Sequence, residues 1–314
     1  MTTMKAVRLH EFGGPDVLRY EDAPRPEAGP GEVLIRVRAV GVNPLDWKTR
    51  EGQMEAMMPH TLPLILGTDA AGTVEAGGLG VTEFKPGDEV FASVGMVRDG
   101  SYAEYVLADA KAMALKPKSA DFETAASTPG AALTAWQALF DIARLSAGQT
   151  VLIHGAGGAV GSAAVQFAKN VGATVIATAS SADKGYVQGL GADTVVDYKA
   201  ERFEDAARDV DVVLDTVGGE TQARSFATMK KGGVLVATVA PPDMDAAAKA
   251  GVTAKMIQLS QNGAQLREIG QLMDAGKFQV RVGLVLPLSE ARQAQERGQA
   301  GQARGKIVLQ VQSS

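Results

Sequence analysis

A glycine-rich turn near the middle of the chain constrains its fold more than any other feature. The apolar run 150–153 leads directly into His154-Gly155-Ala156-Gly157-Gly158-Ala159-Val160-Gly161, and an amphipathic stretch follows as far as Asn170. Strand, glycine turn and helix in this order are typical of a dinucleotide-binding unit, in which backbone N–H groups at the start of the helix face a diphosphate. The pattern therefore predicts a bound dinucleotide, with a turn that serves only tight helix–strand packing as the alternative.

The end of the next expected strand, 174–178, bears on the choice between NADH and NADPH. NAD-binding units usually place an acid there to bind the ribose hydroxyls. Here Ser180 and Ser181 follow, no acid comes before Asp183, and Lys184 is next to it. Small hydroxyls and a cation suit a 2′-phosphate through charge-assisted hydrogen bonds. We therefore expect NADPH, the alternative being that Lys184 is a solvated helix residue.

Two patterns of structure divide the chain. In the first third, short β-branched runs such as 32–40 alternate with Gly/Pro turns, which is typical of a barrel-like β domain. From residue 149 onward, apolar runs alternate with helical stretches, which predicts a parallel, doubly wound sheet. Strands expected near 280–286 and 306–311 are interpreted as returning to the first domain. The expected domains of this α/β protein are residues 1–120 with 259–314, and residues 121–258.

The absence of cysteine excludes several kinds of site. Disulfides, thiolate nucleophiles and zinc sites built on sulfur all need it, and His10, His60 and His154 are far apart in sequence. A net charge of −5 gives no electrostatic reason to expect nucleic acid as the partner. No apolar run is long enough for a membrane span, and no signal-peptide core is visible. We expect a soluble, cytoplasmic protein without a metal.

Further motifs are distributed along nearly the whole chain. They are Ala39-Val40-Gly41-Val42-Asn43-Pro44-Leu45-Asp46, Leu66-Gly67-Thr68-Asp69-Ala70-Ala71-Gly72, Lys85-Pro86-Gly87-Asp88, Gly100-Ser101-Tyr102-Ala103-Glu104-Tyr105, Leu133-Thr134-Ala135-Trp136, Leu190-Gly191-Ala192-Asp193 and Ala303-Arg304-Gly305-Lys306. With the glycine turn, they make the chain similar to the medium-chain dehydrogenase/reductase superfamily, and within it to zinc-independent quinone oxidoreductases of the zeta-crystallin type. The resemblance implies a GroES-like β-barrel domain beside a Rossmann domain. It also implies a homodimer, for which we expect strand 234–237 to form the contact edge.

The positions of the zinc ligands carry other residues in this chain. Members of the superfamily that bind catalytic zinc have Cys where this chain has Asn43, and a His-Glu pair where it has Thr68-Asp69. Neither Asn43 nor Thr68 is a good zinc ligand, and the cysteines of the structural zinc site are missing as well. The sequence therefore does not predict zinc-dependent alcohol oxidation.

The resemblance also implies which residues contact NADPH. Asn43 and Thr134 are expected near the nicotinamide, and Gly155, Gly158, Ala159 and Val160 along the diphosphate. Ser180, Lys184 and Tyr198 are expected at the adenosine 2′-phosphate, and Val217, Val239 and Ala240 on the wall of the cofactor site. Arg304 or Lys306 is expected to approach the phosphates from the C-terminal segment. For catalysis, Asn43 is a candidate donor to the acceptor carbonyl, or a turn residue before Pro44. Tyr102 and His60 are candidate proton donors, with solvent as the alternative.

These residues predict NADPH-dependent reduction of a quinone or another α,β-unsaturated carbonyl. The nicotinamide supplies the hydride, and a conjugated carbonyl is electrophilic enough to accept it without a Lewis acid. Two alternatives stay open at this point. One is reduction of an enoyl thioester, and the other is a non-catalytic NADPH-binding protein with a redox-sensing or interaction role.

Overall fold

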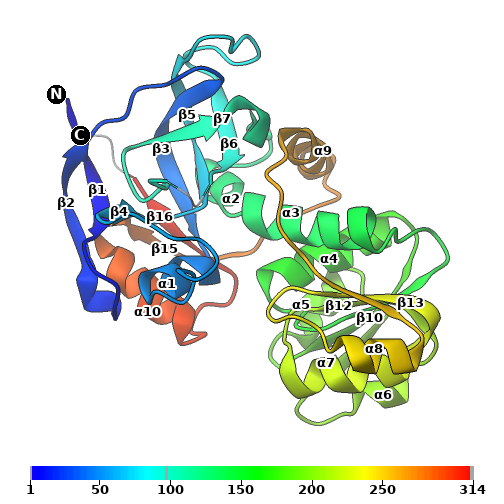
Figure 1. Cartoon of the computed structure of the whole chain (residues 1–314). Helices are drawn as coiled ribbons and strands as arrows, with labels where there is room; N and C mark the ends of the chain where they lie inside the picture. The colour runs from blue at the N-terminus through cyan, green and yellow to red at the C-terminus, as the bar shows by residue number, and fades with distance from the viewer. Residues whose placement is uncertain (1, 96–97, 312–314) are drawn as a thin grey trace. The chain divides into compact units, whose positions relative to one another are not determined.

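The computed structural model describes residues 2–95 and 98–311, which form two compact units (Figure 1). Unit 1 consists of Met1–Gly130, Gln261–Gly276 and Val280–Ser314, and unit 2 of Ala131–Ser260 and Lys277–Gln279. The chain thus leaves unit 1 after Gly130 and returns to it at Gln261. The domain limits expected from the sequence, at residues 120 and 258, stay a prediction.

Unit 1 is built mainly from antiparallel strands. Its strands are β1 (Thr3–Leu9), β2 (Leu18–Pro24), β3 (Glu32–Val42), β4 (Leu64–Ile65), β5 (Asp69–Gly77), β6 (Glu89–Ser93), β7 (Tyr105–Asp109), β8 (Met113–Leu115), β15 (Val282–Pro287) and β16 (Lys306–Gln310). Its helices are η1 (Pro15–Val17), α1 (Pro44–Arg50), η2 (Ala110–Ala112), α2 (Phe122–Ala126), α9 (Gly263–Asp274), η5 (Leu288–Glu290) and α10 (Ala291–Gln299). One sheet has the order β2-β1-β4, and the other β15-β16-β3-β5-β6-β8 with β7 also paired to β3.

Strand β3 lies in the middle of the larger sheet and organises the unit. Val33, Ile35 and Val37 are buried, whereas Arg36 and Arg38 are exposed, which is the period-two pattern of a strand with one covered face. Strand β16 pairs with β3 in antiparallel register, with Ile307 opposite Val42. This pairing brings the C-terminal strand next to the start of α1, where the polar residues of unit 1 gather.

Unit 2 is a doubly wound α/β domain. Its elements after α3 (Pro129–Trp136), which begins at the unit boundary, are η3 (Gln137–Ile142), β9 (Thr150–Ile153), α4 (Ala159–Asn170), β10 (Thr174–Ala179), α5 (Lys184–Gly189), β11 (Thr194–Asp197), α6 (Phe203–Ala206), β12 (Val210–Asp215), α7 (Gly219–Ser225), η4 (Phe226–Thr228), β13 (Met229–Ala237), α8 (Met244–Ala250) and β14 (Thr253–Met256). The six parallel strands have the order β11-β10-β9-β12-β13-β14. The chain starts at β9 and reverses direction across the sheet between β9 and β12, as in a Rossmann fold.

The sheet of unit 2 is covered by apolar side chains. Every residue of β12 is buried, as expected for a central parallel strand with both faces covered. Trp136 packs edge-to-face against Phe167 of α4, with ring centroids 5.2 Å apart.

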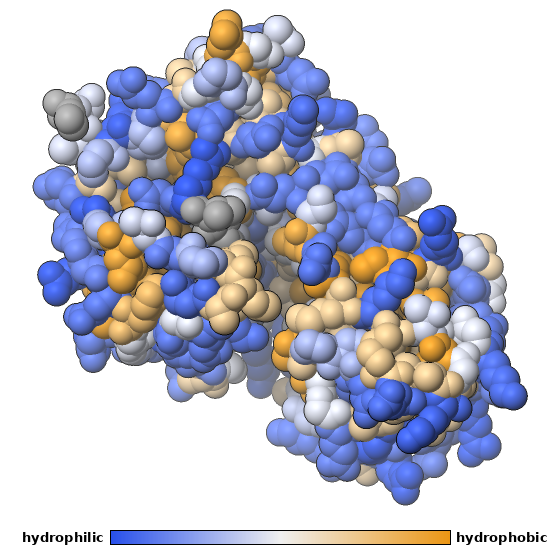
Figure 2. Space-filling model, in the orientation of Figure 1, coloured by the Kyte–Doolittle hydropathy of each residue, from blue (hydrophilic) through white to orange (hydrophobic). Residues whose placement is uncertain are grey.

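The surface in Figure 2 is largely hydrophilic on both units, with small apolar areas. No helix in the described part of the chain is long and apolar enough to cross a membrane.

The sheet order corrects one expectation about the dimer. Residues 234–237 belong to β13, which pairs with β12 on one side and with β14 on the other. Segment 234–237 is therefore not an edge, and β14 is the last strand on that side of the sheet. The sequence did not indicate β14 because Thr-Ala-Lys-Met has a single buried residue, Ala254.

Candidate functional site

The glycine turn of unit 2 joins β9 to α4 and has no room for a side chain at two of its positions. Gly155 has a left-handed backbone conformation, with φ +67°, and a Cβ there would lie 2.4 Å from Thr216 Oγ1. A Cβ on Gly161 would lie 2.4 Å from the carbonyl oxygen of Gly155. Glycine at these positions lets the chain turn sharply and lets α4 pack closely against β9.

The first turn of α4 offers backbone N–H groups to a ligand. Gly158 is the N-cap residue and is exposed. As a glycine it has no side chain to cap the first N–H groups of the helix. Ala159 and Val160 follow and are half-buried. The first N–H groups of a helix have no intrahelical partner and carry the positive end of its dipole, so this turn fits a diphosphate. It also lies where the strand order reverses, which is where doubly wound sheets bind their ligands.

Apolar side chains are exposed at the same carboxyl edge of the sheet. Val217 follows β12 and is 49% exposed, and Val239 follows β13 and is 43% exposed. The backbone of Val217 is fixed by a hydrogen bond of 2.9 Å from its N–H to the carboxylate of Asp215. Ala240, next to Val239, is half-buried, and Thr134 is half-buried on α3. The structure thus places Val217 near Gly155 of the glycine turn, and Val239 near Gly218, which follows Val217.

The residues expected to bind the 2′-phosphate meet at the end of β10. Tyr198 is 57% exposed, and its N–H donates to the carbonyl of Ala179, which ends β10. Ser180 Oγ donates to Asp183 at 3.0 Å, and Lys184 Nζ lies 3.1 Å from Glu201. No local pattern predicts the Glu201 contact, which depends on how the turn after β11 folds back.

In unit 1, Lys306 is buried and fully engaged with protein groups. Its side chain is 5% exposed, and Nζ donates to the carbonyl of Val42 at 2.9 Å and to Asn43 Oδ1 at 2.5 Å. Asp69, which is 0% exposed, places Oδ2 3.8 Å from Nζ. Burial lowers the pKa of Lys306 and raises that of Asp69, and the opposite charge of each partner opposes both shifts. Arg304, the other candidate, lies just before β16 and is exposed.

Asn43 links this cation to the neighbouring carboxylate. Its Oδ1 accepts from Lys306, so its Nδ2 faces the opposite way and donates to Asp69 Oδ2 at 2.9 Å and to Thr68 Oγ1 at 3.1 Å. The other carboxylate oxygen of Asp69 accepts from the N–H of Gly130 at 2.9 Å. The amide orientation of Asn43 is therefore fixed by protein partners on both sides. Asp69 is the member of this network whose role the sequence did not indicate.

Tyr102 is buried and bonded to a second carboxyl group. Its hydroxyl donates to Asp46 Oδ2 at 2.9 Å, and the N–H of Asn43 donates to the same oxygen at 2.8 Å. Burial raises the pKa of Asp46 to about 7, although both hydrogen bonds act in the opposite direction. Burial, followed by the charge of Asp46, holds the pKa of Tyr102 well above its ordinary value. Tyr102 therefore stays protonated, and its hydroxyl donates to Asp46.

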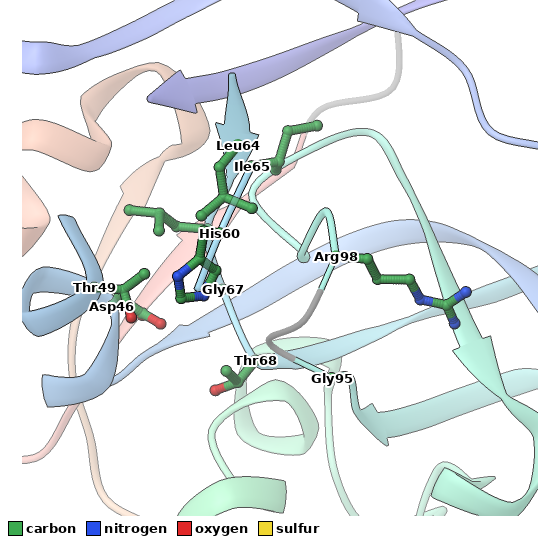
Figure 3. A pocket seen from close by; sticks show the side chains of 10 residues that line it. Asp46, Thr49, His60, Leu64, Ile65, Gly67, Thr68, Gly95 and Arg98 are labelled. Atoms are coloured by element: carbon green, nitrogen blue, oxygen red, sulfur yellow. The ribbon is translucent and has the colours of Figure 1, made fainter. Parts of the chain in front are cut away.

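A small hollow with room for about one water molecule lies beside this network, entirely within unit 1 (Figure 3). Asp46 and Thr49 of α1, His60 of the following loop, and Thr68 line it together with Leu64 and Leu66. In Figure 3 the imidazole of His60 is turned toward Thr49 and Asp46, while Arg98 extends away from them. Of the two candidate proton donors, Tyr102 contacts the carboxyl group of Asp46, whereas His60 contacts Glu55 and only lines the same hollow as Asp46.

His154, at the end of β9, is a structural residue that supports the glycine turn. It is 0% exposed; Nε2 lies 2.9 Å from Ser225 Oγ and Nδ1 lies 3.2 Å from Thr178 Oγ1. Ser225 Oγ donates its proton to the carbonyl of Thr221, so it accepts from His154 Nε2–H. Thr178 Oγ1 in turn accepts from the N–H of Gly155. Burial lowers the pKa of His154 to about 4, so the ring is neutral at pH 7.

We expect this buried histidine to make folding sensitive to mild acid. Between pH 6.5 and about 4 the unfolded chain protonates His154 and the folded chain does not, so stability present above pH 6.5 is lost as the pH falls, by about 3 kcal/mol at pH 4. Urea unfolding near pH 7 and pH 4 measures this loss. In His154→Gln, the loss of unfolding free energy between pH 7 and pH 4 should be smaller than in the wild type by that amount. In the control His10→Gln, at an exposed histidine, the loss should equal that of the wild type. Parallel curves for all three proteins would contradict the assignment.

Two family models match the chain. The alcohol dehydrogenase GroES-like domain matches residues 29–118, and the zinc-binding dehydrogenase family matches residues 190–309. NAD(P)H oxidoreductase RTN4IP1, mitochondrial, from Danio rerio is 33% identical over 99% of the chain and 92% of its own length. The chain belongs to the medium-chain dehydrogenase/reductase superfamily. As a member of this superfamily it is an oxidoreductase, and the expected fold of a GroES-like and a Rossmann domain is confirmed.

Other members of the superfamily are similar over nearly the whole chain. The NADPH-dependent alkenal/one oxidoreductase, chloroplastic, from Arabidopsis thaliana is 36% identical over 98% of the chain and 79% of that protein. The solved quinone oxidoreductase from Coxiella burnetii has a TM-score of 0.90 and 35% identity, covering 99% of this chain and all of that one. A mycobacterial structure solved with NADPH has a TM-score of 0.87 and 33% identity, covering 98% of this chain and all of that one.

The comparisons correct the expected location. A cytoplasmic protein was predicted, but the RTN4IP1 relatives from Danio rerio and Homo sapiens are named mitochondrial proteins, so that prediction was wrong.

The expected absence of a zinc site bears on the described side chains. Among residues 2–95 and 98–311, no three His, Cys, Asp or Glu side chains are grouped as metal ligands. Zinc independence remains a prediction, since one matching family is described by zinc binding.

Proposed function

We propose that this oxidoreductase reduces quinones or other α,β-unsaturated carbonyls with NADPH and without zinc. The observation that carries the proposal is the glycine turn, where the exposed N-cap Gly158 and the first N–H groups of α4 face solvent at the point of strand reversal. Gly155, Gly158, Ala159 and Val160 would hold the diphosphate, and the bound nicotinamide would supply the hydride. The names of the similar quinone and alkenal/one oxidoreductases support the acceptor class.

The cofactor expected from the sequence is NADPH, and its use is confirmed by the NADPH-dependent relative and by the neighbour solved with NADPH. A preference for NADPH over NADH is part of the proposal. Its support is the group of Ser180, Lys184 and exposed Tyr198 at the end of β10, because a hydroxyl and an ammonium can both bind a 2′-phosphate.

Zinc independence is supported by what occupies the positions of the zinc ligands. Asn43 directs its amide to Asp69 and Thr68, and the ammonium of Lys306 lies 3.8 Å from the carboxylate of Asp69. This carboxylate therefore already has a cation and two hydrogen-bond donors. Asn43 and Lys306 act here by orienting one another, and any contact of Asn43 with the nicotinamide or the acceptor carbonyl remains part of the proposal.

Turnover with a small acceptor panel tests this function. The chelator-treated protein is mixed with NADPH or NADH and with para-benzoquinone, an enone or an unactivated ketone, and the loss of nicotinamide absorbance is followed. We expect turnover of the first two acceptors with NADPH, and none of the ketone. If NADPH binds and neither the quinone nor the enone is reduced, the proposal fails.

Replacement of Lys184 tests the cofactor preference. Lys184→Ala should weaken NADPH binding about tenfold and NADH binding less than about twofold, because only NADPH carries the 2′-phosphate. Titrations followed by nicotinamide fluorescence measure both. Lys169→Ala is a matched control, because Lys169 pairs with Asp193 at 2.8 Å near the opposite end of β10. An equal loss for both cofactors would contradict the role of Lys184.

The homodimer also remains a proposal, and its contact moves to β14. An edge strand offers unpaired backbone groups to a second copy of the chain, and Met256 on β14 is 39% exposed. A monomer mass in light scattering would contradict it.

A further inference from the structure

Two of the groups expected to bind the 2′-phosphate are each paired with a carboxylate at the end of β10. Ser180 Oγ donates to Asp183 Oδ2 at 3.0 Å, and Lys184 Nζ lies 3.1 Å from Glu201 Oε1. The side chains of Lys184 and Glu201 are 38% and 50% exposed, so a ligand from solution can reach this ion pair. A 2′-phosphate that binds through Ser180 and Lys184 must therefore take both donors from protein acids.

The carboxylate of Glu201 is held toward Lys184 by the turn that follows β11. The N–H of Glu201 donates to the carbonyl of Asp197 at 2.8 Å, and Glu201 Oε1 accepts from the N–H of Asp197 at 3.4 Å. The hydrogen bond from Lys184, followed by the one from Asp197, lowers the pKa of Glu201, so this carboxylate is charged at neutral pH. Glu201 therefore presents an anion to the ammonium that the phosphate would use.

This group of side chains lies directly beside the glycine turn. A Cβ on Gly157 would lie 3.1 Å from Asp183 Oδ2, so the side chain of Asp183 stands against the turn that is expected to hold the diphosphate. The adenosine ribose of a dinucleotide is joined to its diphosphate. A diphosphate on the turn would therefore bring the 2′ position within reach of these carboxylates as well as of Lys184.

We propose that Glu201 is a specificity-determining residue, which limits the preference for NADPH by competing with the 2′-phosphate for the ammonium of Lys184. This inference rests on the NADPH preference proposed above and identifies a protein group that opposes it. NADPH must displace the carboxylate from Lys184, and its phosphate then lies close to the displaced charge. NADH carries a hydroxyl at the 2′ position, needs no cation there, and leaves the ion pair intact.

The competition is modest because the ion pair is half-exposed. Exposed pairs contribute little free energy, and solvent and salt screen the charges of both partners. A phosphate carries up to about two negative charges and the carboxylate of Glu201 only one, so the phosphate gains the ammonium. The carboxylate therefore lowers the affinity for NADPH without preventing its binding.

Glu201→Gln tests the competition. It removes the charge but keeps the length of the side chain and an oxygen that can accept from the N–H of Asp197. We expect the Kd of NADPH to fall about fivefold and that of NADH to change less than about 1.5-fold, in titrations followed by nicotinamide fluorescence. Asp193→Asn is the matched control, because Asp193 is 42% exposed, pairs with Lys169 at 2.8 Å and accepts from the N–H of Val175. It breaks the same kind of ion pair near the start of β10 and should leave both Kd values unchanged.

Two further titrations identify the groups that compete. In Lys184→Ala the ammonium is absent, so the gain from adding Glu201→Gln should fall below about twofold. Adenosine 2′,5′-bisphosphate, titrated by calorimetry, should show the same gain from Glu201→Gln as NADPH does. Adenosine 5′-monophosphate, which differs from it only by the 2′-phosphate, should show none.

The outcomes separate the competition from the function on which it rests. If the wild type prefers NADPH and Glu201→Gln changes its Kd no more than Asp193→Asn does, the competition is overturned and the preference stands. An equal gain with and without Lys184, or an equal gain for NADH, would also overturn it. If the wild type binds both cofactors equally and Glu201→Gln creates a preference for NADPH, the competition stands and the proposed preference fails. None of these titrations needs an electron acceptor, so a failure to reduce quinones leaves the competition untouched.

Discussion

Gly158→Asp is expected to weaken NADPH binding by about 100-fold or more and to leave the fold intact. Gly158 has φ −81° and ψ 171°, which any residue adopts, and a Cβ there would lie 3.3 Å from the Gly155 carbonyl oxygen, so a small adjustment makes room. Asp is a favoured N-cap residue and would add roughly a few tenths of a kcal/mol to stability. Its carboxylate would occupy the N–H groups of α4 and repel the diphosphate, at a cost of several kcal/mol at close range.

This combination of lost binding and kept stability is what distinguishes a ligand cradle from a packing turn. The Kd of NADPH is measured by nicotinamide fluorescence, and stability by urea unfolding. Gly14→Asp is the control, because Gly14 is the exposed N-cap of η1 in unit 1 and has open space around its Cβ position. It adds the same charge away from the glycine turn and should leave NADPH binding unchanged. If Gly158→Asp bound NADPH normally, the diphosphate would not lie on α4.

Lys306→Met is expected to reduce the free energy of unfolding by about 3 kcal/mol. The substitution removes the ammonium that lies 3.8 Å from Asp69 and donates to the Val42 carbonyl and Asn43 Oδ1. Asp69 is 0% exposed, so its carboxylate would be left buried without a counter-charge. Breaking a buried ion pair from one side typically costs about 3–5 kcal/mol. The lower end applies here because Asp69 keeps the hydrogen bonds from Asn43 and Gly130.

Urea unfolding at pH 7 measures this effect, with two further variants to identify its origin. Lys306→Met with Asp69→Asn removes both charges and should regain part of the loss, although the new amide would meet the Nδ2 of Asn43. Lys116→Met is the matched control, because Lys116 is also mostly buried but pairs with Glu89, which is 55% exposed and can be solvated. If Lys306→Met lost no more unfolding free energy than this control, the ammonium of Lys306 would not be needed to stabilise the carboxylate of Asp69.

The local parts of the fold and site could be predicted from the sequence, and the long-range parts could not. Strand, turn and helix from β9 to α4 are neighbours in the chain, so the glycine pattern indicates both their structure and their ligand. The contact of Lys306 with Asn43 depends instead on the pairing of β16 with β3, whose register no local pattern determines. Lys306 was therefore assigned to the cofactor phosphates, whereas the structure gives it buried protein partners.

Two segments with weak sequence patterns account for the remaining differences. The strand β14 has one buried residue and shows no strand pattern in the sequence, so the sequence predicts the sheet edge at 234–237 instead. The sequence of the loop after α1 indicates only an apolar segment rich in methionine. The contact of its His60 with Glu55, and the position of His60 on the wall of the hollow that Thr49 also lines, follow from a fold of the loop that the pattern does not specify.

We propose that the glycine turn holds the NADPH of a metal-free quinone or enone reductase. The most direct measurement is the rate of NADPH oxidation by para-benzoquinone after exhaustive treatment with a chelator, for the wild type and for Gly158→Asp under the same conditions. We expect the wild type to retain its full rate and Gly158→Asp to lose nearly all of its rate at NADPH concentrations that saturate the wild type. A rate that disappears with the chelator, or that is the same in both proteins, would contradict it.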